Sequence, residues 1–105
     1  MSFDQDKTAK DEQPMSGDYY PTSNPYYEKY VKKLGGFDIL KDEWRWWALV
    51  ATEDTTKHTR SVRWYRWNLD NTVWKIGNCN IDVHNLDFVD LKRKIDLLKE
   101  IYKIN

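Results

Sequence analysis

The 105-residue chain has a single cysteine and no apolar run long enough to span a bilayer. Because Cys79 has no second cysteine to pair with, no disulfide can form within the chain, which fits a reducing compartment. The first residues also lack the charged-then-apolar pattern of a secretory signal. These absences predict an intracellular protein with no membrane association, without distinguishing cytoplasm from nucleus.

A recognisable catalytic or metal-binding pattern is absent as well. The only histidines are His58 and His84, and the group Cys79, Asp82 and His84 does not have the ligand spacing of zinc or iron sites. Gly35-Gly36 follows a helix-like segment instead of opening one, so it does not form a phosphate-binding loop. We therefore expect a protein that is not an enzyme and that uses no metal or cofactor.

The net charge is zero, but the charges are unevenly distributed. Five acidic side chains and two lysines give residues 1–24 a net charge of −3, whereas residues 55–76 carry five basic side chains and one aspartate, a net charge of +4. The acidic segment has almost no aliphatic residues and no periodicity, so it cannot bury enough surface to offset the entropy of ordering. We expect a flexible acidic arm over residues 1–24, followed by one α+β domain over residues 25–105.

The domain is predicted to begin with a short helix. Asn24 can cap it, Pro25 suits its first turn, and Gly35-Gly36 ends it. Between these signals Tyr, Val and Leu side chains recur at helical spacing. A helix of about ten residues is too short to be stable alone, so it must dock on the rest of the domain.

Residues 37–83 are typical of an antiparallel meander of three or four strands. Aromatic and β-branched residues predict strands at 44–52 and at about 59–69, joined by a turn. Asp70-Asn71 supplies a tight turn before a third strand that begins at Thr72. Gly77-Asn78 is either a bulge or a break before a short fourth strand through Val83.

An amphipathic helix is predicted at the C-terminus, capped by Asn85 or Asp87. From Phe88 to Tyr102 apolar residues alternate at steps of three and four, and the resulting stripe is wider than one sheet face needs. Most of the stripe is expected to pack on the sheet, and the surplus predicts a homodimer with this helix at or near the interface. The expected interface residues are Leu91, Leu97, Leu98, Ile101 and Tyr102.

Aromatic and arginine side chains are concentrated in the predicted sheet, which holds all six tryptophans and four of the five arginines. Alternation along the strand 61–67 gives each face both an aromatic and an arginine. Rings can stack on unpaired bases and basic side chains can neutralise phosphates, so the pattern favours sequence-tolerant binding of single-stranded nucleic acid. The expected binding residues are Arg45, Trp47, Arg60, Arg63, Tyr65, Trp67 and Lys75.

Three other interpretations of these side chains are open. The tryptophans can be core residues, with arginines covering their edges through cation–π contacts. They can also form a protein-binding surface, because Trp, Tyr and Arg dominate interface hot spots. A flat aromatic platform for carbohydrate is the third. The main alternative function is therefore a protein-interaction module, such as an inhibitor or adaptor, that uses the same surface.

The segment from Arg60 to Tyr102 resembles single-stranded-DNA-binding proteins of the positive-cofactor-four-like and ThermoDBP-like type. The likeness is carried by Ser61-Val62-Arg63-Trp64-Tyr65-Arg66-Trp67, by Val73-Trp74-Lys75-Ile76-Gly77, and by the strand that leads into the helix from Asn85. It is a likeness of pattern that covers less than half of the chain. It implies a dimer that binds single strands with little sequence preference. The uneven charge distribution in turn suggests that the acidic arm competes for the basic sheet or recruits a partner.

Overall fold

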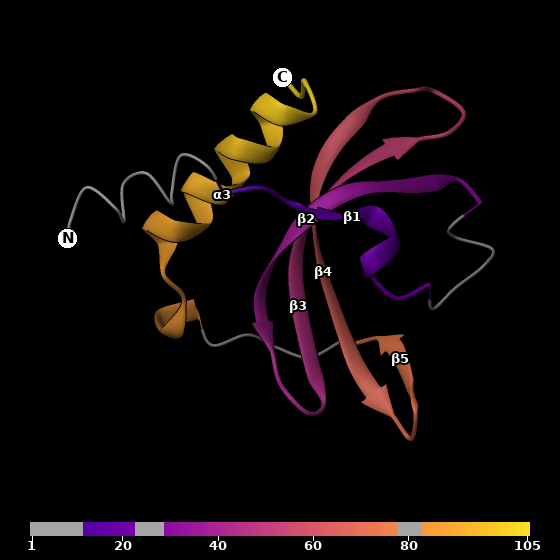
Figure 1. The fold of residues 1–105 in the computed structure, drawn as a ribbon, viewed down its shortest axis with the longest axis vertical. Helices are drawn as coiled ribbons and strands as arrows, with labels where there is room; N and C mark the ends of the chain where they lie inside the picture. The colour runs from indigo at the N-terminus through magenta and orange to yellow at the C-terminus, as the bar shows by residue number, and fades with distance from the viewer. Residues whose placement is uncertain (1–11, 23–28, 78–82) are drawn as a thin grey trace.

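The computed structural model describes residues 12–22, 29–77 and 83–105. They form an antiparallel five-stranded sheet in the order β1-β2-β3-β4-β5 and one α-helix (Figure 1). This confirms the predicted α+β class, although the sheet has more strands than predicted. The elements are β1 (Met15–Ser16), the 3-10 helix η1 (Gly17–Tyr19), β2 (Val31–Lys41), β3 (Arg45–Asp54), β4 (Arg60–Asp70), β5 (Val73–Ile76), the 3-10 helix η2 (Val83–Asn85) and α3 (Phe88–Ile101).

The predicted meander is confirmed for the strands β3, β4 and β5. The carboxylate of Asp54 accepts hydrogen bonds from two backbone N–H groups in the β3–β4 turn, at 2.9 and 2.8 Å. Asn71 has a φ of 57°, which suits the tight β4–β5 turn. The expected fourth strand lies partly outside the described residues, and Val83 begins η2 instead.

The predicted N-terminal helix is wrong where the structure describes it, because the sequence from Val31 onward forms strand β2. Gly35 and Gly36 lie within this strand, between β1 on one side and β3 on the other. A Cβ atom on Gly36 would lie 2.3 Å from the Leu49 carbonyl oxygen, and one on Gly35 would lie 2.0 Å from the Tyr102 hydroxyl. The two glycines therefore permit close packing within a strand and do not end a helix.

The C-terminal helix α3 is confirmed. Asp87 is its N-cap, and the Asp87 carboxylate accepts a hydrogen bond from the Asp90 backbone N–H at 3.1 Å. Leu98 is fully buried against the sheet, beside Leu49 and Phe37. This cluster lies on the face of the sheet that α3 covers, which we call the helix face.

The opposite face of the sheet is covered by the segment Gly17–Tyr20, and we call it the tyrosine face (Figure 1). Tyr20 is only 3% exposed and packs with Trp46 and Trp67. Residues 1–11, 23 and 24 of the expected acidic arm lie outside the described residues. The intervening segment contributes β1, η1 and a core tyrosine to the fold.

Candidate interaction surfaces

The residues expected to bind nucleic acid are divided between the two faces of the sheet. Trp46 pairs with Trp67 and Trp47 pairs with Arg66 in the register of β3 and β4. Because side chains alternate along a strand, Arg63, Tyr65 and Trp67 lie on the tyrosine face. The others lie on the helix face or at its margin: Arg45, Trp47, Arg60 and Lys75.

The aromatic members of this set are buried. Trp67 is completely inaccessible, and Tyr65 and Trp47 are 7% and 8% exposed. The Trp67 ring is stacked between two tyrosines, 5.7 Å from the Tyr20 ring and 5.3 Å from the Tyr65 ring. A base cannot stack on Trp67 unless Tyr20 leaves the sheet, and Trp47 is buried on the helix face, so the aromatic side chains of this set form core.

Tyr19 and Asp38 fix the covering segment to the sheet. Asp38 accepts hydrogen bonds through both carboxylate oxygens, from the Tyr19 hydroxyl at 2.7 Å and from the Trp46 indole N–H at 2.6 Å. The hydrogen bond to Asp38, together with burial, raises the pKa of Tyr19 to about 12. The Lys41 ammonium lies 3.7 Å from the centre of the Trp46 ring, which is a cation–π contact.

Three of the four basic members of the set form ion pairs with acidic side chains. Arg45 pairs with Asp42, and Lys75 pairs with Asp70 at 2.9 Å. Arg60 bonds to Glu53 and also donates a hydrogen bond to the carbonyl of residue 102 at 2.8 Å. The partner guanidinium lowers the pKa of Asp42, which keeps that carboxylate charged. These pairs reduce the positive field that a phosphate backbone needs.

The most exposed apolar side chains of the helix lie in its first turn. Phe88 is 60% exposed and Val89 is 82% exposed. Of the six tryptophans, all of which the structure describes, only Trp44 is strongly exposed, at 61%. Unlike Trp44, which is single, Phe88 and Val89 border a groove of about 550 Å³ along α3. Phe88 and Val89 therefore form the apolar end of this groove.

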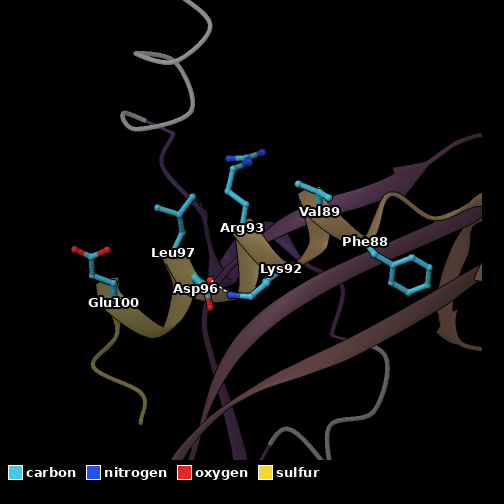
Figure 2. Close-up of a pocket in the computed structure, with 7 residues that line it drawn as sticks. All are labelled: Phe88, Val89, Lys92, Arg93, Asp96, Leu97 and Glu100. Carbon is cyan, nitrogen blue, oxygen red and sulfur yellow. Dashed lines mark hydrogen bonds and ion pairs between the residues drawn. The ribbon is translucent and has the colours of Figure 1, made fainter.

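The groove lies on the outer face of α3 (Figure 2). Figure 2 shows Val89, Arg93 and Leu97 projecting from the side of the helix that faces away from the strands. The face is lined in chain order by Phe88, Val89, Lys92, Arg93, Asp96, Leu97 and Glu100. Its N-terminal half therefore carries two cations, its C-terminal half two carboxylates, and apolar side chains lie in both halves.

Local ion pairs already hold some of these charges. Lys92 bonds to Asp96 at 2.7 Å, one turn along the helix. Arg93 bonds to Asp90 and to Glu12 of the N-terminal segment. The side chains of Lys92 and Asp96 remain 78% and 55% exposed, so their pair is solvent-screened and contributes little to stability. Both charges remain accessible to a partner.

The residues expected at a dimer interface are also divided. Leu98 is fully buried, and Leu91 and Tyr102 pack against the helix-face core. Leu97 packs against the same core at its edge and also lines the outer groove, and Ile101 is 38% exposed. Sequence periodicity did not single out Phe88, Val89 or the charged side chains as a surface, because it cannot tell which side of the helix meets the sheet. The signal that the sequence did offer was the pair of adjacent apolar residues Phe88 and Val89 directly after the N-cap Asp87.

Within the described ranges, no three His, Cys, Asp or Glu side chains are grouped so that they could hold a metal ion. Across these same ranges, no helix has both the length and the apolar composition to cross a membrane. The sequence matches no family model, and comparisons with curated proteins and solved structures found no match. The resemblance to single-stranded-DNA-binding proteins therefore stays a prediction.

Proposed function

We propose that this chain is a non-enzymatic protein-interaction module that binds other protein chains through the outer face of α3. The partner that we propose for this face is a second copy of the chain, which gives a homodimer. The observation that carries the proposal is the exposure of Phe88 and Val89 along a groove with opposite charges at its two ends. The sheet, in this account, is the scaffold that presents the helix.

The order of charges on this face favours self-association. A two-fold interface must be complementary to itself, because both partners present the same patch. In an antiparallel pair of α3 helices, the Lys92 and Arg93 end of one copy meets the Asp96 and Glu100 end of the other.

The size of the surface predicts a weak dimer. A helix of 14 residues is roughly 21 Å long. One helix face of this length buries less than the roughly 800 Å² per partner of a standard interface. We therefore expect a dissociation constant in the micromolar range, so that monomer and dimer exchange and other partners can compete for the same groove.

Protein binding is favoured over nucleic-acid binding because most of the residues expected to bind nucleic acid are either buried or paired with acidic side chains. Stacking needs accessible rings, but Trp67 and Tyr65 are in the core. Phosphate binding needs a positive field, but Arg45 and Arg60 bond to carboxylates. Binding of a protein in the α3 groove needs neither stacking rings nor a positive field, because the groove offers apolar contact and side chains of both charges.

We expect Val89→Glu to weaken self-association at least tenfold. The substitution puts a charge into the apolar end of the groove, and a tenfold change corresponds to about 1.4 kcal/mol. Sedimentation equilibrium of the wild type and the variant over micromolar to millimolar concentrations measures the effect. Val73→Glu is the matched control, because Val73 is also exposed but lies on β5. This control should dimerise like the wild type.

A wild type that stays monomeric at millimolar concentration would overturn the choice of a second copy as occupant. Equal weakening of the dimer by Val73→Glu would show that α3 is not the interface.

Titration with a mixed-sequence single-stranded oligonucleotide tests the nucleic-acid hypothesis. Salt-sensitive quenching of tryptophan emission by the oligonucleotide would favour that hypothesis over protein binding, whereas unchanged emission is the result that we expect.

A further inference from the structure

The described part of the acidic N-terminal segment, residues 12–22, contacts α3 through Glu12. The Glu12 carboxylate bonds to the Arg93 guanidinium, which is 81 positions later in the chain. A contact between residues so far apart is set by the fold and not by local sequence. The charge pattern of the sequence predicted that acidic residues of this segment compete for a basic surface, and in the structure this carboxylate bonds to a cation of the helix.

Arg93 occupies the middle of the α3 groove. Val89, Arg93 and Leu97 follow one another at steps of four residues, so their side chains lie in one row along the helix. Figure 2 shows these three side chains projecting from the outer side of α3, and all three line the groove. A partner that docks along the groove therefore has to pass Arg93.

Two carboxylates neutralise Arg93 within a single chain. The hydrogen bond to Glu12, followed by the hydrogen bond to Asp90, raises the pKa of Arg93. Asp90 also pairs with Lys94 at 2.9 Å, so it is shared between two cations. The side chains of Arg93 and Glu12 are 35% and 32% exposed, whereas the side chain of Lys92 is 78% exposed. Arg93 is therefore the less accessible of the two cations in the groove.

Glu12 and Asp90 differ in how they can respond to a partner. Asp90 lies one turn of α3 before Arg93, so it stays beside the guanidinium whenever the helix is folded. Glu12 precedes β1, so its bond to Arg93 can open while α3 stays folded. When the Asp96 and Glu100 end of a second helix approaches, Glu12 either leaves the guanidinium or repels the incoming carboxylates. Both events lower the affinity of the dimer.

We propose that Glu12 is an autoinhibitory residue, which holds Arg93 within its own chain and thereby weakens self-association through α3. This inference rests on the proposed function, because it concerns the regulation of the same groove. In the monomer the Glu12 carboxylate occupies the guanidinium, and in the dimer the acidic end of the second helix replaces it. Another protein that reaches Arg93 with acidic side chains meets the same competition.

We expect Glu12→Gln to tighten the dimer by about threefold to tenfold. The substitution preserves the size of the side chain and removes its charge. A surface ion pair shifts an equilibrium by up to about fivefold, and a two-fold dimer contains this contact twice. Sedimentation equilibrium of the full chain measures the dissociation constants at low and at high salt. Screening should narrow the difference between wild type and variant at high salt.

Two controls separate this contact from a general effect of net charge. Asp18→Asn makes the same change of charge in the same segment, but Asp18 is exposed in η1, which covers the tyrosine face, opposite α3. This variant should dimerise like the wild type. In an Arg93→Gln background, Glu12→Gln should have no further effect, because Glu12 acts through the guanidinium.

The outcomes distinguish this inference from the proposed function. If the wild type dimerises and Glu12→Gln dimerises equally or more weakly, the autoinhibitory role is wrong while the α3 interface stands. Equal tightening by Asp18→Asn, or tightening by Glu12→Gln in the Arg93→Gln background, would also overturn the role of Glu12. If neither the wild type nor Glu12→Gln associates at millimolar concentration, the proposed homodimer is wrong and the autoinhibition with it.

Discussion

Tyr20→Ala should destabilise the protein by about 3–5 kcal/mol, the usual loss when a buried aromatic side chain is cut back to alanine. Tyr20 is 3% exposed, and its ring lies 5.7 Å from the rings of both Trp46 and Trp67. Without it the fully buried Trp67 ring loses one of the two tyrosine rings that are stacked on it. Urea unfolding followed by far-UV circular dichroism measures the loss. Small domains have only about 5–15 kcal/mol of stability, so much of the population should unfold at modest urea concentration.

Two control variants separate packing from other effects. The Tyr20 hydroxyl is buried without a hydrogen-bond partner in the described part of the chain, so Tyr20→Phe should leave stability unchanged or raise it. Tyr30→Ala removes a tyrosine that is 41% exposed and should cost less than about 1 kcal/mol. If Tyr20→Ala were as mild as Tyr30→Ala, the N-terminal segment would not be part of the core.

Leu98→Ala should cost about 2–5 kcal/mol and leave the α3 groove chemically unchanged. Leu98 is the fully buried residue of α3 in the cluster that it forms with Phe37 and Leu49. Removing its side chain leaves a cavity between the helix and the sheet. Thermal and urea unfolding of the variant at low protein concentration, where the monomer predominates, measure this loss separately from dimerisation.

The neighbouring Leu97 provides the matched control for Leu98. Leu97 lines the outer groove and is only partly buried. Leu97→Ala should therefore lower monomer stability by much less than Leu98→Ala while weakening the dimer. The reverse ranking, with Leu97 the more important for folding, would mean that α3 meets the sheet with a different face.

Local sequence signals predicted the second half of the fold well. The run of aromatic and β-branched residues and the Asp70-Asn71 turn located β3, β4 and the start of β5. Asp87, followed by a three-four repeat, located α3. These features are set by near neighbours in the chain, through turn chemistry, capping and periodicity, so one sequence is enough to predict them.

The first half of the fold depends on contacts between distant residues, which local signals do not report. Gly35-Gly36 is typical of a helix end, but β1 and β3 approach these glycines from both sides. Tyr19-Tyr20 lies in an acidic, aliphatic-poor segment, yet it covers Trp46 and Trp67 about 26 to 47 residues away in sequence. Tertiary packing therefore outweighs local propensity in both places.

The candidate site was predicted only in part for the same reason. Composition identified the Trp and Arg side chains as unusual, but one strand cannot reveal whether both faces of its sheet are covered. Here both are covered, so Tyr65 and Trp67 became core on one face and Trp47 on the other. The width of the α3 stripe predicted a surplus at Leu97, Leu98, Ile101 and Tyr102, but Leu98 is fully buried and Leu97 and Tyr102 pack against the core. The most exposed apolar side chains of the helix are instead Phe88 and Val89.

The most direct test of the central claim is to reverse each half of the charge pattern on α3 separately. One variant carries Lys92→Glu with Arg93→Glu, so its outer face is acidic, and the other carries Asp96→Lys with Glu100→Lys, so its outer face is basic. Circular dichroism first establishes that both variants fold. Sedimentation velocity of each alone and of their equimolar mixture then gives the oligomeric state.

Antiparallel pairing of α3 predicts that each variant alone is monomeric, because like charges meet across the two-fold axis. The mixture should form a one-to-one heterodimer at least as tight as the wild-type dimer, and salt should weaken it. Monomers in the mixture at concentrations where the wild type dimerises, or dimers of either variant alone, would contradict self-association through the outer face of α3.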